Sequence, residues 1–313
     1  MRTVTIPVLV ALGLFGLNAA NAADLDYGVL RGPEYEPAVP LVDWSGLYFG
    51  AHAGYTSASH SYSSVFQPTL ANYFRRRDIE SEFSVSSLLT TGSQRVEGTS
   101  FGAFAGYNFQ FDETVLGLEV DYTRFGKQSS SFNEIARAFS TSGGMREEVY
   151  LAGTSTTKIE DYGTIRGRAG YAIGNFMPFV TGGFAIGRAN ITDAVTVQNY
   201  GYNQGTYQAN QQLTSGSPAY VTNHGYRSFN QAYPGIRSTP AGQGVQTIPD
   251  DPTALAVVAK TKTVGGITLG AGLEYALTQN LLLRAEYQYV LFNDFDGHKA
   301  NLNTVRGGAA VKF

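Results

Sequence analysis

The chain has 313 residues, a formal net charge of −3 and no cysteine. The slightly acidic balance argues against nucleic acid as the main partner, and the lack of cysteine excludes a disulfide framework and thiol chemistry. The 37 Gly, 20 Tyr and 19 Phe, set against only 15% charged residues, favour an all-β protein.

The N-terminus has the pattern of a secretory signal peptide over residues 1–22. Arg2 supplies the positive start, residues 8–17 the apolar core, and residues 20–22 (Ala-Asn-Ala) a small-residue cleavage site. The apolar core is too short to span a bilayer. Residues 23–43 follow with three prolines among charges, which predicts an extended periplasmic lead-in.

Eight later segments alternate between an apolar row and a polar row, and the clearest is Leu281–Leu291. Alternation with a period of two predicts β-strands with one apolar face, and about 11 residues is the length of a tilted membrane-spanning strand. In chain order the predicted strands are Gly46–Thr56, Thr99–Phe111, Val115–Phe125, Asp161–Gly174, Phe176–Arg188, Val264–Tyr275, Leu281–Leu291 and Leu302–Phe313.

The connections between these strands differ strongly in length. Three of them are short turns, and one is a loop of about seven residues around residues 294–299. The other three are predicted as long loops, at about 57–96, 126–158 and 189–262. A loop as long as the last one is either functional or a sign of missed elements. Within it, residues 194–200 and 206–213 are candidates for a hairpin.

Short turns at one end and long loops at the other are typical of a transmembrane barrel. We therefore predict an all-β domain over residues 44–313, an eight-stranded antiparallel up-and-down transmembrane β-barrel with long extracellular loops and both termini in the periplasm. A half-buried strand in a soluble sheet would give the same alternation. However, a polar row rich in glycine has no purpose on a water-exposed face, and it suits a narrow interior.

The polar rows of the predicted strands carry acidic and basic residues together. Inside one narrow barrel each charge needs a partner, and eight strands leave room only for side chains. This favours a charge network that plugs the lumen over an ion path. The predicted members are Glu119, Asp121, Arg166, Arg168, Glu274, Arg284, Glu286, Arg306 and Lys312.

Several segments resemble the small outer-membrane barrels of the OmpA/OmpX and opacity-protein type, and in particular alphaproteobacterial porin-family surface antigens. They are DWSGLYFGAHAGY (residues 43–55), GAFAGYNFQF (102–111), RGRAGYAIG (166–174), GAGLEYAL (270–277) and the terminal Phe313. The resemblance implies that Phe313 forms part of the signal read by the outer-membrane assembly machinery. The long 189–262 stretch departs from the compact family pattern, so no loop-borne activity is carried over.

The predicted loops contain two further candidate features. Arg75, Arg76 and Arg77 are candidates for contact with lipopolysaccharide phosphates, which suit the arginine fork; a solvated charge run is the alternative. The third long loop is rich in tyrosine, which suits an adhesive or haem-stacking surface; the alternative is that these tyrosines decorate extended strands just above the membrane. Its tyrosines are Tyr200, Tyr202, Tyr207, Tyr220, Tyr226 and Tyr233.

The four histidines show no spacing typical of a metal site or of a catalytic triad. His52 is expected to face the barrel lumen, and His60, His224 and His298 lie in predicted loops. We therefore expect no enzymatic activity, no metal and no cofactor. The predicted role is envelope integrity or adhesion-like surface recognition in the outer membrane, among lipid and lipopolysaccharide, with a host or surface ligand held by the loops. The alternatives are a haem receptor using loop Tyr and His residues, and a narrow porin-like channel.

Overall fold

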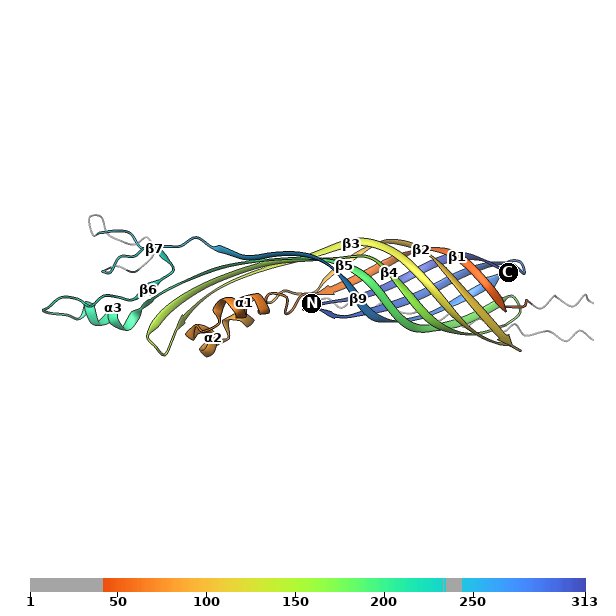
Figure 1. Cartoon of the computed structure of the whole chain (residues 1–313), viewed down its shortest axis with the longest axis horizontal. Helices are drawn as coiled ribbons and strands as arrows, with labels where there is room; N and C mark the ends of the chain where they lie inside the picture. Colours follow the sequence, from red (N-terminus) through yellow and green to blue (C-terminus); the bar gives the residue numbers. More distant parts are fainter. Residues whose placement is uncertain (1–41, 233, 235–243) are drawn as a thin grey trace, which may run out of the picture. The chain divides into compact units, whose positions relative to one another are not determined.

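The computed structural model describes residues 42–232, 234 and 244–313. The predicted signal peptide and the predicted lead-in up to residue 41 lie outside these residues, as does Tyr233. Eight long strands form the fold (Figure 1). They are β1 (Gly46–Ser61), β2 (Gln94–Phe111), β3 (Thr114–Ser140), β4 (Met145–Tyr171), β5 (Phe176–Asn203), β9 (Thr253–Ala276), β10 (Leu281–Phe295) and β11 (His298–Lys312).

The eight long strands close into an antiparallel barrel. Neighbours in sequence pair with each other, and the ring is completed where β1 pairs with β11. All eight predicted strands are therefore confirmed, together with the up-and-down order. Closure leaves no free edge within the barrel, which is what hydrocarbon surroundings require of backbone N–H and C=O groups.

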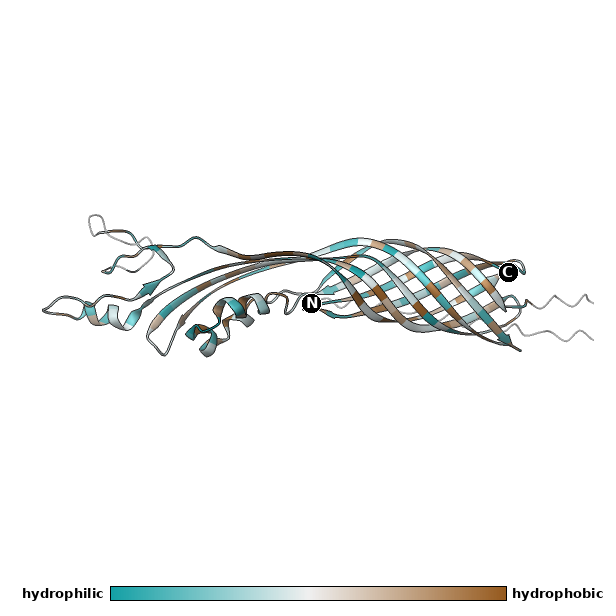
Figure 2. Cartoon of the chain, in the orientation of Figure 1, coloured by the Kyte–Doolittle hydropathy of each residue, from teal (hydrophilic) through white to brown (hydrophobic). Residues whose placement is uncertain are grey.

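The predicted apolar row faces outward around the barrel. Figure 2 shows hydrophobic and hydrophilic residues interspersed along the strands of the barrel. Leu118, Ile165 and Phe184 are 67%, 62% and 72% exposed. Aromatic side chains mark both ends of this band, with Phe109 and Phe313 near the short turns and Tyr55 and Tyr122 near the opposite end, which we call the rim. Such girdles are typical of barrels that span a membrane.

The strands are longer than predicted, and this corrects the prediction of long loops. β3 and β4 remain paired from Thr114 opposite Tyr171 to Ser140 opposite Arg146, so 126–158 is a hairpin and not an irregular loop. β5 likewise continues to Asn203, paired with β4 as far as Asn203 and with β9 as far as Val197. We call the parts of β3, β4, β5 and β9 beyond the rim (residues 127–140, 145–159, 189–203 and 253–263) the extension (Figure 1).

Two further predictions about connections were wrong. Residues 206–213 form no hairpin strand, since they fall largely in helix α3 (Gln204–Gln211), capped by the Asn203 side chain that accepts from the backbone N–H of Thr206. The seven-residue loop after β10 is instead a two-residue turn, because both Asp296 and Gly297 adopt positive φ (61° and 81°). An Asp-Gly pair with this backbone joins hairpin strands tightly.

The predicted first loop, 57–96, is also shorter than expected and contains helices, because β1 continues to Ser61 and β2 begins at Gln94. Between β1 and β2 it contains α1 (Gln67–Phe74), α2 (Asp78–Phe83) and the 3-10 helix η1 (Val85–Ser87). We call residues 62–89 the cap. Its apolar residues form one buried cluster with inward residues of the extension. The cluster comprises Tyr62, Val65, Phe66, Leu70, Phe74, Ile79, Val85, Leu89, Val149, Leu151, Val195 and Val197.

The remaining strands are short and lie outside the barrel. β6 (Asn223–His224) adds to β5, while β7 (Tyr226–Ser228) pairs with β8 (Ile248–Pro249). No helix among the described residues is long and apolar enough to cross a membrane.

We predict that Phe66→Ala releases the cap while leaving the barrel intact. Phe66 is 1% exposed, and its ring lies where a Cβ on Gly153 of β4 would come within 2.7 Å. Removing a buried Phe side chain typically costs about 3–5 kcal/mol. Limited proteolysis in lipid vesicles should therefore cut within the cap of the variant much faster. The exposed residue Phe132 supplies the control, and equal cutting of Phe66→Ala and Phe132→Ala would contradict the assignment.

Candidate functional site

The barrel interior has a charged layer between two apolar layers. Near the short turns, Trp44, Tyr48 and Met177 are fully buried with their neighbours. Towards the rim, Phe292 and Leu302 belong to a second buried apolar cluster. The charged layer lies on inward positions of five strands and contains four arginines and four carboxylates. They are Arg166, Arg168, Arg284, Arg306, Glu119, Asp121, Glu274 and Glu286.

Ion pairs join the members of the charged layer across the lumen. Arg284 lies 2.7 Å from Glu119 and 2.6 Å from Glu274. Arg168 contacts Glu274 at 2.5 Å, and Arg166 pairs with both Glu119 and Glu286. Each of these side chains is at most 2% exposed, so every charge is neutralised within the layer.

The rim side of the layer is completed by Arg306 and His52. Arg306 lies 2.8 Å from Asp121 and 3.0 Å from Glu286. His52 Nε2 lies 3.0 Å from Asp121, in the inward position predicted from the sequence. Lys312 does not join these pairs: its ammonium donates to the backbone carbonyls of Asp43 and Ser45, at 3.3 Å for Ser45.

Aromatic rings and glycines determine the shape of the charged layer. The Arg284 guanidinium lies 4.0 Å from the ring centre of Phe104, and that of Arg168 lies 4.2 Å from Phe179, distances suited to cation–π attraction. A Cβ on Gly50 would approach the Phe104 ring to 2.3 Å. Glycine in the polar row therefore makes room for the rings that hold the arginines.

The structure places Arg77 far from the rim. Its guanidinium donates to the side chain of Asn199 and lies 4.7 Å from the Tyr73 ring centre. Asn199 pairs with Val149, ten residues beyond Ile159 at the rim, and a strand rises about 3.3 Å per residue. Arg77 thus lies roughly 30 Å along the strands beyond the rim, and the contact of Arg75, Arg76 and Arg77 with lipopolysaccharide phosphates stays a prediction.

Polar and aromatic side chains gather at the tip of the extension. His224 Nε2 lies 2.8 Å from Glu147, whose other carboxylate oxygen accepts from Asn199 at 2.9 Å. Burial would raise the pKa of Glu147, but the bonds from His224 and Asn199 and the charge of Arg77 lower it. A pocket of about 350 Å³ opens beside these groups.

The predicted tyrosine surface forms two ring contacts at this tip. The Tyr200 and Tyr226 ring centres lie 5.3 Å apart, and those of Tyr202 and Tyr207 lie 6.0 Å apart. Tyr220 is 73% exposed. Burial, with Glu148 nearby, raises the pKa of Tyr200 to about 12, so its hydroxyl stays protonated and donates to Glu148 at 3.1 Å.

A buried polar cluster beneath the cap was not anticipated from the sequence. His298 Nδ1 lies 2.8 Å from Thr157 Oγ1, and its Nε2 lies 3.2 Å from Asp193. His60 Nδ1 lies 2.9 Å from Ser129 Oγ. Both histidines are 0% exposed. The sequence signal is weak, because serine and threonine at inward positions of a strand have the composition of a loop.

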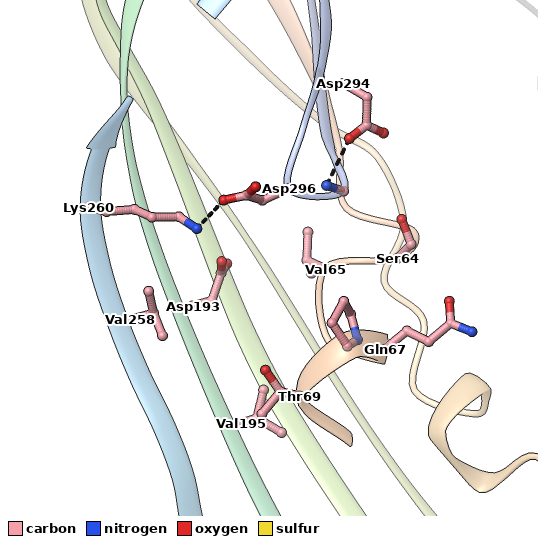
Figure 3. Close-up of a pocket in the computed structure, with 12 residues that line it drawn as sticks. Ser64, Val65, Gln67, Thr69, Asp193, Val195, Val258, Lys260, Asp294 and Asp296 are labelled. Carbon is pink, nitrogen blue, oxygen red and sulfur yellow. Dashed lines mark hydrogen bonds and ion pairs between the residues drawn. The ribbon is translucent and has the colours of Figure 1, made fainter. Parts of the chain in front are cut away.

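The pocket shown in Figure 3 lies between the extension, the start of the cap and the β10–β11 turn. It has a volume of about 450 Å³. Lys260 of β9 pairs with Asp296 of the turn, and Lys262 lies 2.5 Å from the same carboxylate. Hydrogen bonds from these two lysines lower the pKa of Asp296. Within the described residues, no group of three or more His, Asp or Glu side chains is arranged to hold a metal ion.

A closed eight-stranded antiparallel barrel with an apolar outer surface and a neutralised polar interior defines a small membrane-spanning β-barrel. The sequence comparisons give the family: the model of the outer membrane protein beta-barrel domain matches residues 8–313, and the chain belongs to this family. The predicted resemblance is therefore confirmed, and the family is one of the outer membrane.

Two curated relatives are similar along their whole length. The 31 kDa outer-membrane immunogenic protein of Brucella melitensis is 30% identical over 321 residues, covering 98% of each chain. The 25 kDa outer-membrane immunogenic protein of Brucella ovis is 23% identical over 316 residues, covering 100% of each.

Two solved structures give lower similarity. Ail of Yersinia pestis aligns with a TM-score of 0.32 and 11% identity, over 86% of this chain and 99% of that one. OprG of Pseudomonas aeruginosa aligns with a TM-score of 0.33 and 10% identity, over 86% and 97%. The family assignment rests on the sequence comparisons.

We predict that Arg284→Ala destabilises the barrel more than Leu283→Ala does. The first change removes the guanidinium that pairs with Glu119 and Glu274 inside the lumen. Breaking a buried ion pair in this way lowers the free energy of unfolding by roughly 3–5 kcal/mol. The second loses only apolar burial, roughly 1–3 kcal/mol. Urea unfolding in lipid vesicles, followed by the heat-dependent shift on gels, measures both. Equal midpoints would show that the pairs add little.

The cap should loosen in acid because of His60. Burial, with the charge of His298 nearby, lowers the pKa of His60 to about 4. The pKa of an unfolded histidine is near 6.5. At pH values between the folded and the unfolded pKa, the unfolded state binds the proton and the folded state does not. The free energy of unfolding therefore falls as the pH falls through this range. Hydrogen exchange of the cap should accelerate from pH 7 to 4. His60→Asn should flatten that dependence, and an unchanged pH profile would contradict this role of His60.

Proposed function

We propose that this protein is a closed outer-membrane barrel that displays an ordered recognition surface and neither conducts ions nor catalyses a reaction. The observation that carries the proposal is the extension with its cap. Four strands remain paired with one another beyond the rim, and a buried apolar cluster fixes the cap to them. A chain whose only task was to span the membrane would need neither element.

The proposed absence of conduction is supported by the interior. Eight strands enclose only side chains, and here two apolar layers enclose a charged layer whose ions are paired. Trp44, with 0% exposure, fills the end near the short turns. A narrow porin-like channel would need a continuous wetted path through all three layers, so we favour the plug.

The proposed orientation has the extension outside the cell and both termini in the periplasm. The support is the asymmetry of the barrel, since short turns face the periplasm and longer connections face outward in this class. Phe313 then lies at the periplasmic end, where its N–H donates to Leu47 at 2.9 Å and its ring contacts Phe49. This position is compatible with a role of Phe313 as an assembly signal.

A surface site for haem is the second candidate, because Tyr200, Tyr226 and His224 come together at the tip. His224 is bound to Glu147 and Tyr200 to Glu148, so haem would have to displace these contacts. Titration of the refolded protein with haem separates the candidates: a Soret shift lost in His224→Ala favours the receptor, and its absence removes it.

We predict that shortening the extension abolishes adherence without unfolding the barrel. Bacteria displaying the full chain are compared with bacteria displaying a variant in which 128–157 and 190–261 are replaced by short turns. Adherence to cultured host cells should fall to the level of cells without the protein. As a control, both populations must contain equal amounts of folded barrel in the outer membrane, measured by the change in gel mobility on heating. Undiminished adherence of the variant would refute the recognition role.

A further inference from the structure

The extension has two strand edges that lack a partner among the described residues. β9 pairs with β5 as far as Thr253, but with β10 only up to Gly266 opposite Phe292. β3 pairs with β4 as far as Ser140, but with β2 only up to Arg124. On the β3 edge the Ser129 carbonyl accepts from the Tyr62 hydroxyl at 3.0 Å. Beyond this contact, each edge presents backbone N–H and C=O groups that can pair with another strand.

The free edge of β9 has the composition of a pairing strand. Its segment Thr253–Ala259 reads TALAVVA, without a charge, a proline or a glycine. Val257 and Val258 are 71% and 40% exposed. Lysines commonly protect such edges, but Lys260 and Lys262 are bound to Asp296 of the same chain. The uncharged segment is left available for association.

The two free edges match each other in position and direction. Phe132 of β3 is opposite Thr154, Thr154 is opposite Ala194, and Ala194 is opposite Val257 of β9, so one row of the sheet joins the edges. Phe132 is 61% exposed. β3 runs away from the short turns and β9 runs towards them, and copies in one membrane share one orientation. The β3 edge of one copy is thus antiparallel to the β9 edge of another.

We propose that the occupant of the β9 edge is the β3 edge of a second copy of this chain, which continues the sheet of the extension from one barrel to the next. Phe132 and Val257 would then form a pair of the aromatic and β-branched type that stabilises neighbouring strands. Because each copy offers one edge of each kind, the contact is heterologous and continues into rings or rows beyond the dimer. The contact requires that the copies lie in the same membrane, and it requires no ligand.

Cysteine cross-linking tests this directly, since the chain has no native cysteine. Phe132→Cys and Val257→Cys are combined in one chain, and intact membranes are treated with a short bismaleimide. The expected result is a ladder of dimers, trimers and larger species. There are two controls. One is Val257→Cys alone, and the other combines Val257→Cys with Arg95→Cys on β2. Both should give no species beyond the dimer.

Two outcomes of the cross-linking would overturn the proposal. One is the absence of cross-linked species in the Phe132→Cys/Val257→Cys chain. The other is an equal yield of dimer from Val257→Cys alone with no ladder in the combined variant, which would show β9 pairing with β9. Loss of adherence in the shortened barrel bears on the proposed function and not on this contact, so the two can fail separately.

A matched pair of lysine variants gives a second measurement. Val257→Lys and Thr154→Lys add the same charge in the same row and on the exposed face of the sheet, but only Val257 lies on an edge strand. With amine cross-linking in membranes, Val257→Lys should lower the multimer fraction several-fold, while Thr154→Lys leaves it unchanged. Equal effects would contradict edge pairing. The heat-dependent gel shift verifies that both barrels are folded.

Discussion

The structure depends on the mutual neutralisation of four arginines and four carboxylates inside a barrel too narrow for bulk water. A buried unpaired ion is destabilising by several kcal/mol, so the layer is stable only when all its members are in place. Those members come from β3, β4, β9, β10 and β11. The layer thereby links strands far apart in sequence, and its partners fix the register in which the barrel closes.

The same strands that form the barrel also carry the extension, and this links the membrane part to the surface part. Beyond the rim most inward positions carry serine, threonine, histidine and aliphatic residues, such as Ser155, His298 and Val195. Asp193 and Glu147 are acidic residues there, each bound to a histidine. The apolar part of that face is covered by the cap, whose helices contribute Phe66 and Leu70 to the shared cluster. The barrel holds one end of the sheet of the extension, and the cap supplies the second layer that a sheet needs in water.

The membrane part was predictable because its pattern is strict. Residues such as Leu118 and Phe184 must face lipid while Glu119 and Arg166 must face inward, so a period of two identified all eight strands and the members of the charged layer. The prediction that Lys312 belongs to that layer rests only on its position in the polar row of its strand. Its long side chain instead reaches the carbonyls of Asp43 and Ser45, a contact that alternation does not encode.

The extension was not predictable in the same way. Its inward residues include Ser129, Ser131 and Thr157, which are buried under the cap but are polar, and a run such as residues 128–131 resembles a loop in composition. The long strands are recognisable only once the cap is known to cover them. Similarly, the contact of Phe66 with Gly153 joins residues 87 positions apart, and no local pattern indicates it.

The central claim is that the lumen is closed by paired charges between two apolar layers. The conductance of the purified full-length protein in planar lipid bilayers tests it most directly. We predict small, unsteady currents or none over a range of voltages and salt concentrations. Large, stable single-channel steps in the unaltered protein, with the same size in Arg284→Ala, would contradict the closed lumen and favour a pore.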